Sequence, residues 1–479
     1  MFFGIFHHEP WRDEAHVWRA ARDNTIEGII GDIRYEGTPT LWTLVLVPFA
    51  KAGMPYPITM QLVHAAFAIS AVGLLLFYSK IQPFTKIAFI FSYYMAYEYA
   101  VVARHYVLTT FLLFSIAAIY SKRFKTPIVY AVLVTLLLQT NAYSIVPAGA
   151  LIVLFGVQTY IDRKVSRRTI IALFIMIAGA LFTVISLFPD RSVPYNPLPP
   201  QNPVHEIQNV ILESIAPSSI HMPLEFIELH RLRIKIVSAV CLLSFVFMVL
   251  FSRKAQLIFL SLAMISWIFV MNILIHAGGL RHHGLILIFL MFLYWLYEVH
   301  RKEESVFGKV MRRVFMVSLS GLLALSILFT VYIYDSEYRY EFSGGKDMAG
   351  YIKSHNLESM RTAAFPGTVG ESVLAYFKDK KYWNPEFASY GYRNVADFRY
   401  QPLLQKMNTE EALRFIRGSF SDGKPYLLLL YYPLSHEELD GYTLVHVSHS
   451  NFGPLESIWL YSMARPENNV PAAQEDHAP

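Results

Sequence analysis

The sequence predicts an α-helical polytopic membrane protein with about 10 to 12 transmembrane helices and a small C-terminal α/β domain. Three observations predict this class. Of the 479 residues, 54% are apolar and 16% are charged, whereas roughly 25% of the residues of a soluble globular protein are charged. Aromatic residues make up 15% of the chain, and such side chains gather at membrane interfaces. Long apolar runs recur as far as residue 334, and the composition is mixed beyond it.

Apolar runs long enough to cross a bilayer occur about ten times, since a helical span needs roughly 20 residues. The expected spans lie near residues 58–78, 84–101, 104–120, 127–141, 143–160, 169–189, 234–251, 255–276, 282–299 and 314–334. The shorter run 38–50 is expected to be a partial or broken span. Residues 1–6 are too few for a span or a signal peptide, so we expect a first transmembrane helix to be missing before them.

Short loops rich in Lys and Arg predict the orientation, because such loops are retained on the cytoplasmic side. The basic loops are residues 79–86, 121–125, 162–168, 252–254 and 300–313. The opposite side then receives Arg104 and His105, residues 141–144, the loop 189–235, residues 278–284 and everything after Tyr334. We therefore expect a multi-pass membrane protein whose functional groups and C-terminal domain lie outside the cytoplasm.

The composition divides the chain into four parts. They are an external loop with an interfacial helix (1–37), the transmembrane core (38–334), an external α/β domain (335–466) and a disordered tail (467–479). Within the α/β domain, periodicity predicts helices at 346–354, 370–378 and 409–417 and strands at 362–365, 426–432, 443–448 and 458–464. The long loop 189–235 inside the core is expected to be a lid or a binding segment.

Charge and cysteine content exclude two classes of interaction. The net charge of +5 is small and dispersed, which argues against a nucleic-acid partner. Cys241 is the single cysteine, so it has no intrachain disulfide partner. We expect it to be a core or lipid-facing residue.

The segment 7–39 carries many charges and two tryptophans directly before the apolar spans. Asp13 and Glu14 stand at the start of an expected helical stretch, 15–22. On composition alone, this is an interfacial amphipathic helix whose acidic N-terminus is favoured by the helix dipole. A catalytic loop at the membrane surface is the alternative. Further polar groups on the same inferred face favour that alternative: Arg34, Tyr35, Glu36, Arg104, His105, Asn141, Tyr143, Arg281, His282 and His283.

This arrangement resembles the GT-C superfamily of membrane glycosyltransferases, particularly the bacterial relatives of protein O-mannosyltransferases and lipid A aminoarabinose transferases. In those enzymes an Asp-Glu pair opens the first external loop, and a Tyr-Glu-x-x-Pro segment followed by an aromatic residue leads into the next span. Asp13-Glu14, the segment 35–39 and Trp42 match these features. Thr38 stands where the aminoarabinose transferases carry a lysine. The resemblance extends over essentially the whole chain and implies a bacterial inner-membrane protein.

The resemblance implies an inverting enzyme that moves a sugar from a polyprenyl-phosphate donor to an acceptor glycan, lipid or protein. It assigns Asp13 as the base for the acceptor hydroxyl and Glu14 as an orienting group or second base, an effect worth roughly 10²–10⁴ in rate. Arginine side chains would bind the departing phosphate. The candidate donor-phosphate and substrate-binding residues are Arg104, His105, Arg281, His282, His283, Arg34, Tyr35, Glu36 and Tyr143.

Other interpretations of these side chains stay open. Arginine at a span end can extend toward the interface, aromatic rings can mark the interface, and Asn141 can serve a turn. The two adjacent histidines, 282 and 283, could bind zinc with His276. Adjacent histidines share one ion poorly, so we predict no metal site. The lipid-linked sugar is the donor expected, and a divalent metal stays an open alternative that no motif supports.

Two other classes compete with an enzyme. A transporter or flippase of a lipid-linked sugar would show ionisable groups near the bilayer midplane and broken helices in paired repeats. Glu98 and His64 lie within expected spans, but the sequence shows no repeat. A non-enzymatic scaffold presenting the C-terminal domain leaves the acidic loop unexplained. The C-terminal domain lacks a recognisable nucleophile, phosphate loop or metal motif, and we expect it to bind the acceptor or to stabilise the core.

Overall fold

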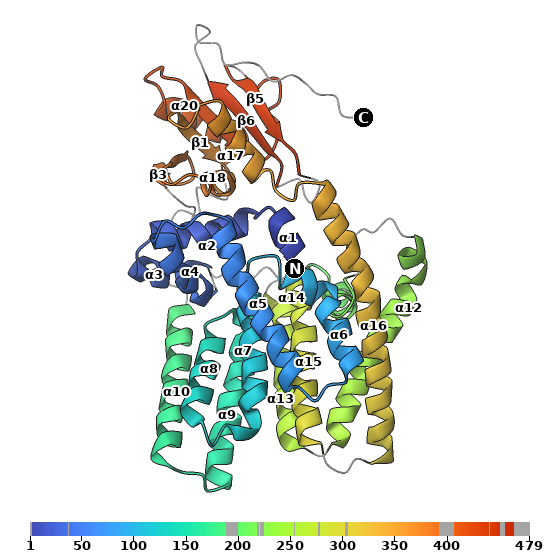
Figure 1. Ribbon diagram of the computed structural model, residues 1–479. Helices are drawn as coiled ribbons and strands as arrows, with labels where there is room; N and C mark the ends of the chain where they lie inside the picture. Colours follow the sequence, from blue (N-terminus) through green and yellow to red (C-terminus); the bar gives the residue numbers. More distant parts are fainter. Residues whose placement is uncertain are drawn as a thin grey trace.

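A helical bundle and a C-terminal sheet domain follow one another along the long axis of the molecule (Figure 1). The computed structural model describes residues 2–36, 38–187, 200–217, 220, 225–252, 254–275, 278–301, 305–391, 407–439, 441–450 and 456–463. In this part of the chain, seven helices are long and apolar enough to cross a membrane. Their length and composition identify a membrane protein with a small C-terminal sheet, as the sequence predicts.

The seven long helices form most of the bundle. They are α5 (Ile58–Tyr78), η3 with α9 (Ala142–Ser144 and Ile145–Ile161), α10 (Arg167–Leu187), α12 (Glu225–Phe251), α13 with η4 (Ala255–Val270 and Met271–Ile275), α14 with α15 (Leu280–His283 and Leu285–His300) and α16 (Val306–Arg339). At 1.5 Å per residue, the 34 residues of α16 extend for about 50 Å. This helix therefore rises beyond the rest of the bundle and leads directly into the C-terminal domain (Figure 1).

Two of the ten expected spans are shorter in the structure than the sequence predicts, namely α6 (Pro83–Phe91) and α8 (Pro127–Leu138). The expected span 104–120 is α7 with η2 (Tyr106–Ile119 and Tyr120–Lys122), which has the predicted length and is shifted by two residues. The expected span 84–101 breaks at Ser92, where the π-helical turn η1 (Tyr94–Glu98) and irregular backbone follow. α8 gives way to a turn in which the Asn141 side chain accepts a hydrogen bond from the Ser144 N–H. Polar groups thus interrupt these helices at the end of the bundle that faces the C-terminal domain, here called the domain-proximal end.

Four short helices form a layer between the bundle and the sheet domain (Figure 1). They are α1 (Phe2–His7), α2 (Arg12–Asp23), α3 (Ile26–Glu36) and α4 (Leu41–Lys51). The run 38–50, expected to be a partial span, is α4, which packs against α2. Its 11 residues cover about 16 Å, roughly half of the hydrocarbon thickness. This length explains why α4 stays at the domain-proximal end.

The C-terminal domain is a six-stranded mixed sheet with helices on both faces. Its elements are α17 (Gly345–Ser354), β1 (Arg361–Phe365), α18 (Gly367–Leu374), β2 (Tyr382–Asn384), β3 (Ser389–Gly391), α20 (Thr409–Ser419), β4 (Tyr426–Leu430), β5 (Thr443–Ser448) and β6 (Ile458–Met463). The strand order is β3-β2-β1-β4-β6-β5. β1 pairs in parallel with β2 and β4, and the other pairs are antiparallel. The predicted helices and strands are confirmed with small shifts of their ends, whereas the three-residue strands β2 and β3 were not predicted.

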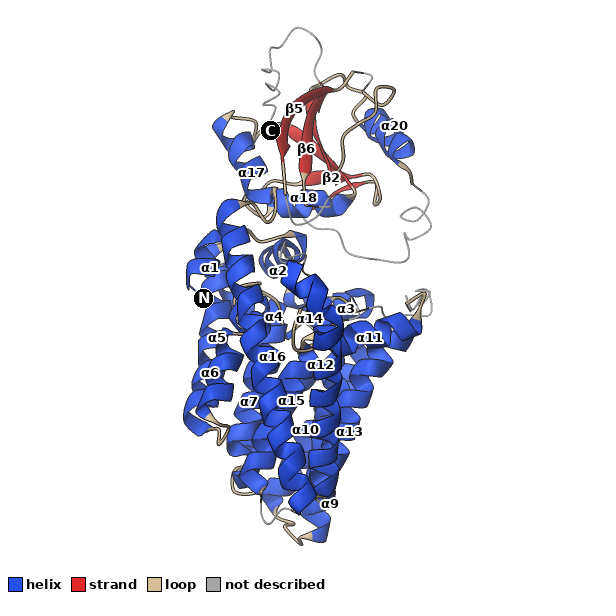
Figure 2. Cartoon of the chain, turned by 90° about the vertical axis from the view of Figure 1, so that its right-hand side faces the viewer, coloured by secondary structure: helices blue, strands red, loops and turns tan. Residues whose placement is uncertain are grey.

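The continuous apolar run of β4 explains its central position, because a strand covered on both faces needs apolar residues at every position. All five of its residues are buried. Leu427 and Leu429 pack with residues of α17 and α18, while Leu428 and Leu430 pack with residues of α20. α18 lies between the sheet and α2 (Figure 2), so one face of the domain rests on the helical layer.

We expect Leu428→Ala to destabilise the C-terminal domain by about 2–5 kcal/mol, because the substitution leaves a cavity in a fully buried layer. Thermal unfolding of the purified full chain, followed by limited proteolysis of the domain, measures the change. Phe415→Ala in α20 is the matched control, since that side chain is 42% exposed. Equal midpoints for the two variants would contradict the placement of β4 in the core.

Candidate functional site

Asp13 lies between two arginines that come from distant parts of the chain. It stands in the first turn of α2, and Arg104 Nη1 donates a hydrogen bond to its Oδ2. Arg281 Nη2, from α14, lies 3.5 Å from the same oxygen. Burial raises the pKa of the Asp13 carboxyl, but the positive charges of Arg104 and Arg281 outweigh it and bring the pKa below its ordinary range. The sequence predicted all three residues as site residues, and the structure brings them together.

Trp11, which the sequence did not single out, orders the arginines. The guanidinium carbon of Arg281 lies 5.0 Å from the centre of the indole ring, and that of Arg104 lies 5.9 Å from it. Cations at this distance are attracted to the face of an aromatic ring. The ring therefore restricts both guanidinium groups to the side of Asp13.

Glu14 joins the start of α2 to the irregular backbone that follows η1. Its side chain is fully buried. Oε1 accepts a hydrogen bond from the Ala103 N–H at 2.6 Å, and Oε2 accepts one from the Trp11 N–H at 3.3 Å. These bonds place Asp13 beside Arg104, the residue that follows Ala103. Glu14 is absent from the walls of both cavities described below, so the structure places it as a positioning residue, and its role as a second base stays a prediction.

His8 joins Glu14 to the top of α16. Its Nε2 lies 3.0 Å from Glu14 Oε2 and its Nδ1 lies 2.9 Å from Glu337 Oε1. The Tyr97 hydroxyl also donates a hydrogen bond to Glu337. Burial alone lowers the pKa of His8, but the two carboxylates outweigh it and raise the pKa well above the ordinary value. The buried ring of His8 therefore links the end of α1 to α2 and α16.

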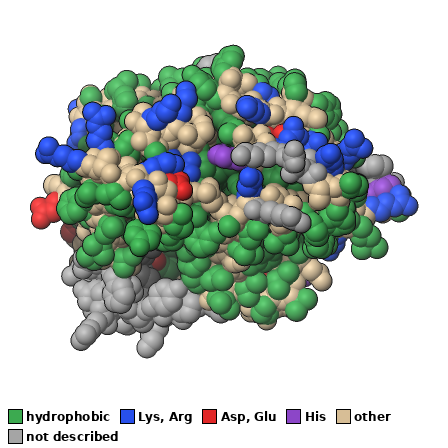
Figure 3. Space-filling model, turned by 90° about the horizontal axis from the view of Figure 1, so that it is seen from below, with side chains coloured by type: hydrophobic (Ala, Val, Ile, Leu, Met, Phe, Trp, Pro, Cys, Tyr) green, Lys and Arg blue, Asp and Glu red, His purple; other side chains and the backbone are tan. Residues whose placement is uncertain are grey.

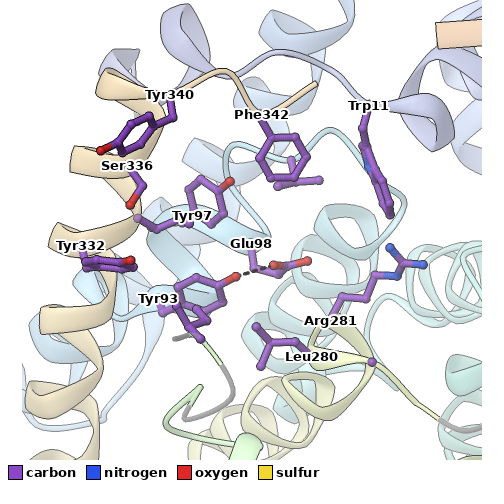
Figure 4. Close-up of a pocket in the computed structure, with 14 residues that line it drawn as sticks. Trp11, Tyr93, Tyr97, Glu98, Leu280, Arg281, Tyr332, Ser336, Tyr340 and Phe342 are labelled. Carbon is purple, nitrogen blue, oxygen red and sulfur yellow. Dashed lines mark hydrogen bonds between the residues drawn. The ribbon is translucent and has the colours of Figure 1, made fainter. Parts of the chain in front are cut away.

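A cavity of about 810 Å³ lies on one side of the Asp13 cluster. We call it the first cavity. Aromatic rings dominate its wall, and Glu98 and Arg281 stand among them (Figure 4). Its lining residues are Trp11, Tyr93, Tyr97, Glu98, Val102, Ile220, Gly279, Leu280, Arg281, Tyr332, Ile333, Ser336, Tyr340 and Phe342. The Tyr93 hydroxyl donates to Glu98 Oε2 at 2.9 Å, so this carboxylate is held within the aromatic wall.

A second cavity of about 410 Å³ lies between α2, α4 and α18. Its wall is more polar and includes groups of the C-terminal domain. The lining residues are Arg12, Asp13, His16, Val17, Thr38, Pro39, Thr40, Trp42, Thr43, Arg104, His105, Thr368 and Glu371. Arg281 and Trp11 belong to the first cavity, whereas Asp13 and Arg104 belong to the second. The Asp13 ion pairs therefore stand where the two cavities meet.

The remaining predicted histidines and Tyr143 have different places. His105 lines the second cavity, and burial together with the charge of Arg104 lowers the pKa of its ring. His282 Nδ1 accepts the Gly279 N–H at 2.9 Å, and its ring stacks on Tyr143 at 5.1 Å. His283 Nε2 lies 3.1 Å from Glu206 Oε1. His282, His283 and Tyr143 are not lining residues of either cavity, and these contacts fix the start of α14 near Arg281.

The segment that carries the Tyr-Glu-x-x-Pro pattern ends at the second cavity. Arg34, Tyr35 and Glu36 close α3, but their side chains fall outside the described part of the structure. Thr38, Pro39 and Trp42 line the second cavity. Trp42 Nε1 donates to the Ala103 carbonyl at 3.1 Å. The Trp42 indole and the Glu14 carboxylate therefore bind the two backbone groups of the same residue, Ala103.

Metal-ligating side chains do not cluster in the described ranges: no group of three or more His, Cys, Asp or Glu there could hold an ion. The histidine pair at 282 and 283 points to different partners, as described above. His276, the third residue weighed for a zinc site, lies outside the described residues.

Sequence reasoning missed residues on both cavities. His16 follows Asp13 by three positions on the helix, a spacing that puts both side chains on one face, so this residue could have been found. Tyr93 and Tyr97 were not recognised as lining residues, because the sequence predicted a continuous span at residues 84–101. Glu371 becomes visible only when the C-terminal domain is folded onto α2.

Comparison with known proteins gives no match: no family model, no curated protein and no solved structure is similar to this chain.

We expect the stability of the folded chain to fall as the pH rises through the raised pKa of His8. The folded state binds this proton more tightly than the unfolded state does. The stabilisation is therefore complete below the unfolded pKa of about 6.5 and is lost as the pH rises through the folded pKa. Thermal midpoints in detergent between pH 6 and about pH 10 measure it.

His8→Gln should flatten that pH dependence, whereas His7→Gln should leave it unchanged, because the His7 Nδ1 bonds to the Phe3 carbonyl at the surface. The same slope in wild type and in His8→Gln would show that the buried His8 does not bind the proton.

Proposed function

We propose that the chain is an inverting glycosyltransferase of the GT-C type, which moves a sugar from a polyprenyl-phosphate donor to an external acceptor. One observation carries the proposal: a carboxylate paired with two arginines stands at the junction of a large aromatic cavity and a smaller polar cavity. Two substrates of different character can reach this junction from two sides. The Asp-Glu pair and the motif at residues 35–39 support the same class.

The first cavity suits the donor. Aromatic faces stack on sugar rings, and Tyr93, Tyr97 and Tyr340 supply them together with hydroxyl groups (Figure 4). Arg281 can bind an anionic phosphate bidentately. Tyr332 and Ser336 are contributed by α16, one of the helices long enough to span the membrane. A lipid chain can therefore lie along the bundle while its head group enters the cavity.

The second cavity suits the acceptor, because it holds Asp13 and a polar wall. An acceptor hydroxyl there would attack the anomeric carbon from the side opposite the phosphate, and this geometry inverts the configuration. The bond from that carbon to the phosphate oxygen breaks, and the phosphate keeps the electron pair. Arg281 and Arg104 would stabilise the developing negative charge, an arrangement that supplies a large share of catalysis in many enzymes.

The charge distribution supports a site outside the cytoplasm. The end of the bundle away from the C-terminal domain carries many Lys and Arg side chains and few acidic ones (Figure 3). These include Lys80, Lys122, Lys125, Lys164, Arg167, Arg168, Lys254 and Lys309. Basic loops are retained in the cytoplasm, so both cavities and the C-terminal domain would face the other side.

A flippase or transporter of a lipid-linked sugar is the second candidate. The π-helical turn η1 breaks an apolar segment beside the first cavity, and Glu98 lies in that turn. Broken helices with an ionisable group line the substrate sites of many transporters. Such a protein would need the aromatic cavity and Glu98, but it would not need the carboxylate of Asp13 to form a glycosidic bond.

We expect Asp13→Asn to reduce sugar transfer by at least about 100-fold, because Arg104 and Arg281 lose the anion that holds them in place to stabilise the departing phosphate. Transfer of radiolabelled sugar from a panel of polyprenyl-phosphate donors, in membranes containing the chain, measures this. Asp162→Asn is the control, since Asp162 lies at the opposite end and is 44% exposed. Transfer by Asp13→Asn at the wild-type rate would refute the catalytic assignment, and lipid-linked sugar movement without any transfer would favour the flippase.

We expect Arg281→Gln to raise the KM for the donor about tenfold or more, because the first cavity loses the cation that faces the phosphate. The KM for the acceptor should change much less. Steady-state transfer at varied donor and acceptor concentrations separates the two constants. An unchanged donor KM would place the phosphate elsewhere.

A further inference from the structure

The second cavity contains a histidine that is held by a buried carboxylate of the C-terminal domain. His16 Nδ1 lies 2.7 Å from Glu371 Oε2. The Glu371 side chain is 2% exposed and that of His16 is 21% exposed. Both residues line the second cavity. His16 lies one helical turn after Asp13 on α2, and Glu371 lies on α18.

We propose that His16 accepts the proton of the acceptor hydroxyl and that Glu371 positions the imidazole for this step. The inference rests on the proposed function and adds a catalytic residue and a positioning residue to it. It also assigns the C-terminal domain a direct part in the acceptor side of the site, because Glu371 belongs to that domain.

The arrangement of Asp13 explains why a second group is needed. Oδ2 of Asp13 already accepts a hydrogen bond from Arg104 and faces Arg281. The resulting low pKa makes this carboxylate a weak proton acceptor, because the strength of a general base follows its pKa. Asp13 therefore serves better as the anion that holds the arginines. An imidazole ring is the side chain that most often serves as a general base.

The carboxylate behind His16 is the group that such a base requires. A buried carboxylate at Nδ1 fixes the tautomer of the ring and stabilises the imidazolium once the proton arrives. Glu371 reaches His16 because α18 packs directly on α2. Gly370 permits a close approach of α18 to the sheet, since a Cβ there would meet the Tyr382 ring at 2.9 Å. Thr368, one turn before Glu371, adds a hydroxyl to the same wall.

The proposed step balances in atoms and electrons. The acceptor oxygen forms a bond to the anomeric carbon while the bond from that carbon to the phosphate oxygen breaks. The phosphate leaves with the electron pair, and the acceptor proton moves to His16. The imidazolium then releases the proton to solvent, which restores the starting state.

A purely structural role for the pair is the competing explanation, because other side chains also join α2 to the domain. Arg22 Nη1 donates to the carbonyls of Ala375 and Phe377 at 3.2 and 2.9 Å. Arg22 is not a lining residue of either cavity. Arg22→Ala is therefore the matched control that weakens the docking of the domain and leaves the walls of the cavities in place.

The experiment measures transfer of radiolabelled sugar by the purified full chain with the donor that wild type uses. We expect His16→Ala to lower kcat at least 100-fold with the donor KM unchanged, and added imidazole to restore part of kcat, since it can occupy the space of the lost ring. Glu371→Gln should lower kcat about tenfold, and it should add little to His16→Ala, because Glu371 acts through His16. Arg22→Ala should keep kcat within about threefold of wild type.

Three results would overturn the inference. Wild-type kcat in His16→Ala would remove His16 from the reaction. Equal losses in His16→Ala and Arg22→Ala, with no rescue by imidazole, would assign the pair to domain docking. If His16→Ala does not fold, His16→Gln replaces it in the experiment. Wild-type kcat in His16→Gln would likewise show that His16 takes no part in the reaction. A wild-type chain that transfers no sugar from any donor refutes the proposed function itself, which distinguishes that failure from the others.

Discussion

The buried carboxylate of Glu14 is the constraint on which the geometry of the site depends. Its two oxygens bind the Trp11 and Ala103 N–H groups and the ring of His8. A buried charge of this kind is stable only when it is fully bonded. The first turn of α2 must therefore meet the irregular backbone near residue 103, and Asp13 and Arg104 are the next residues along each segment. Their ion pair follows from the Glu14 contacts rather than creating them.

The same constraint separates the two cavities. Once Asp13 is fixed beside Arg104, the indole of Trp11 and the guanidinium of Arg281 face the aromatic side, while the later turns of α2 face α4 and α18. Trp11, at the start of α2, thus lines the first cavity, whereas His16 and Val17, one to two turns later, line the second. A carboxylate at such a boundary can act on a charged group in one cavity and on a neutral group in the other.

The sequence predicted the class of fold because long apolar runs need no tertiary information to be recognised. It predicted Arg104 and Arg281 because polar residues at the ends of apolar runs stand out, and it predicted Asp13 through the resemblance of the Asp-Glu pair to GT-C enzymes. The end of α6 was harder to predict, since apolar residues continue through the π-helical turn η1 and conceal the break. His282 and His283 look like ligands in sequence, but partners distant in the chain, Tyr143 and Glu206, give them structural contacts. The pairing of His16 with Glu371 depends on a contact across 355 residues, which local patterns do not encode.

The placement of the C-terminal domain follows from α16 and bears on the chemistry. This helix continues beyond the bundle into the C-terminal domain (Figure 2). In that domain α18 packs on α2, the helix that carries Asp13. Arg19 shows how closely the two surfaces fit, because its side chain is buried and its guanidinium carbon lies 5.5 Å from the centre of the Tyr382 ring. A cavity walled by both parts exists only when they are joined. In the proposed glycosyltransferase the C-terminal domain would complete the acceptor side, so changes in α18 would alter the second cavity and leave the aromatic first cavity as it is.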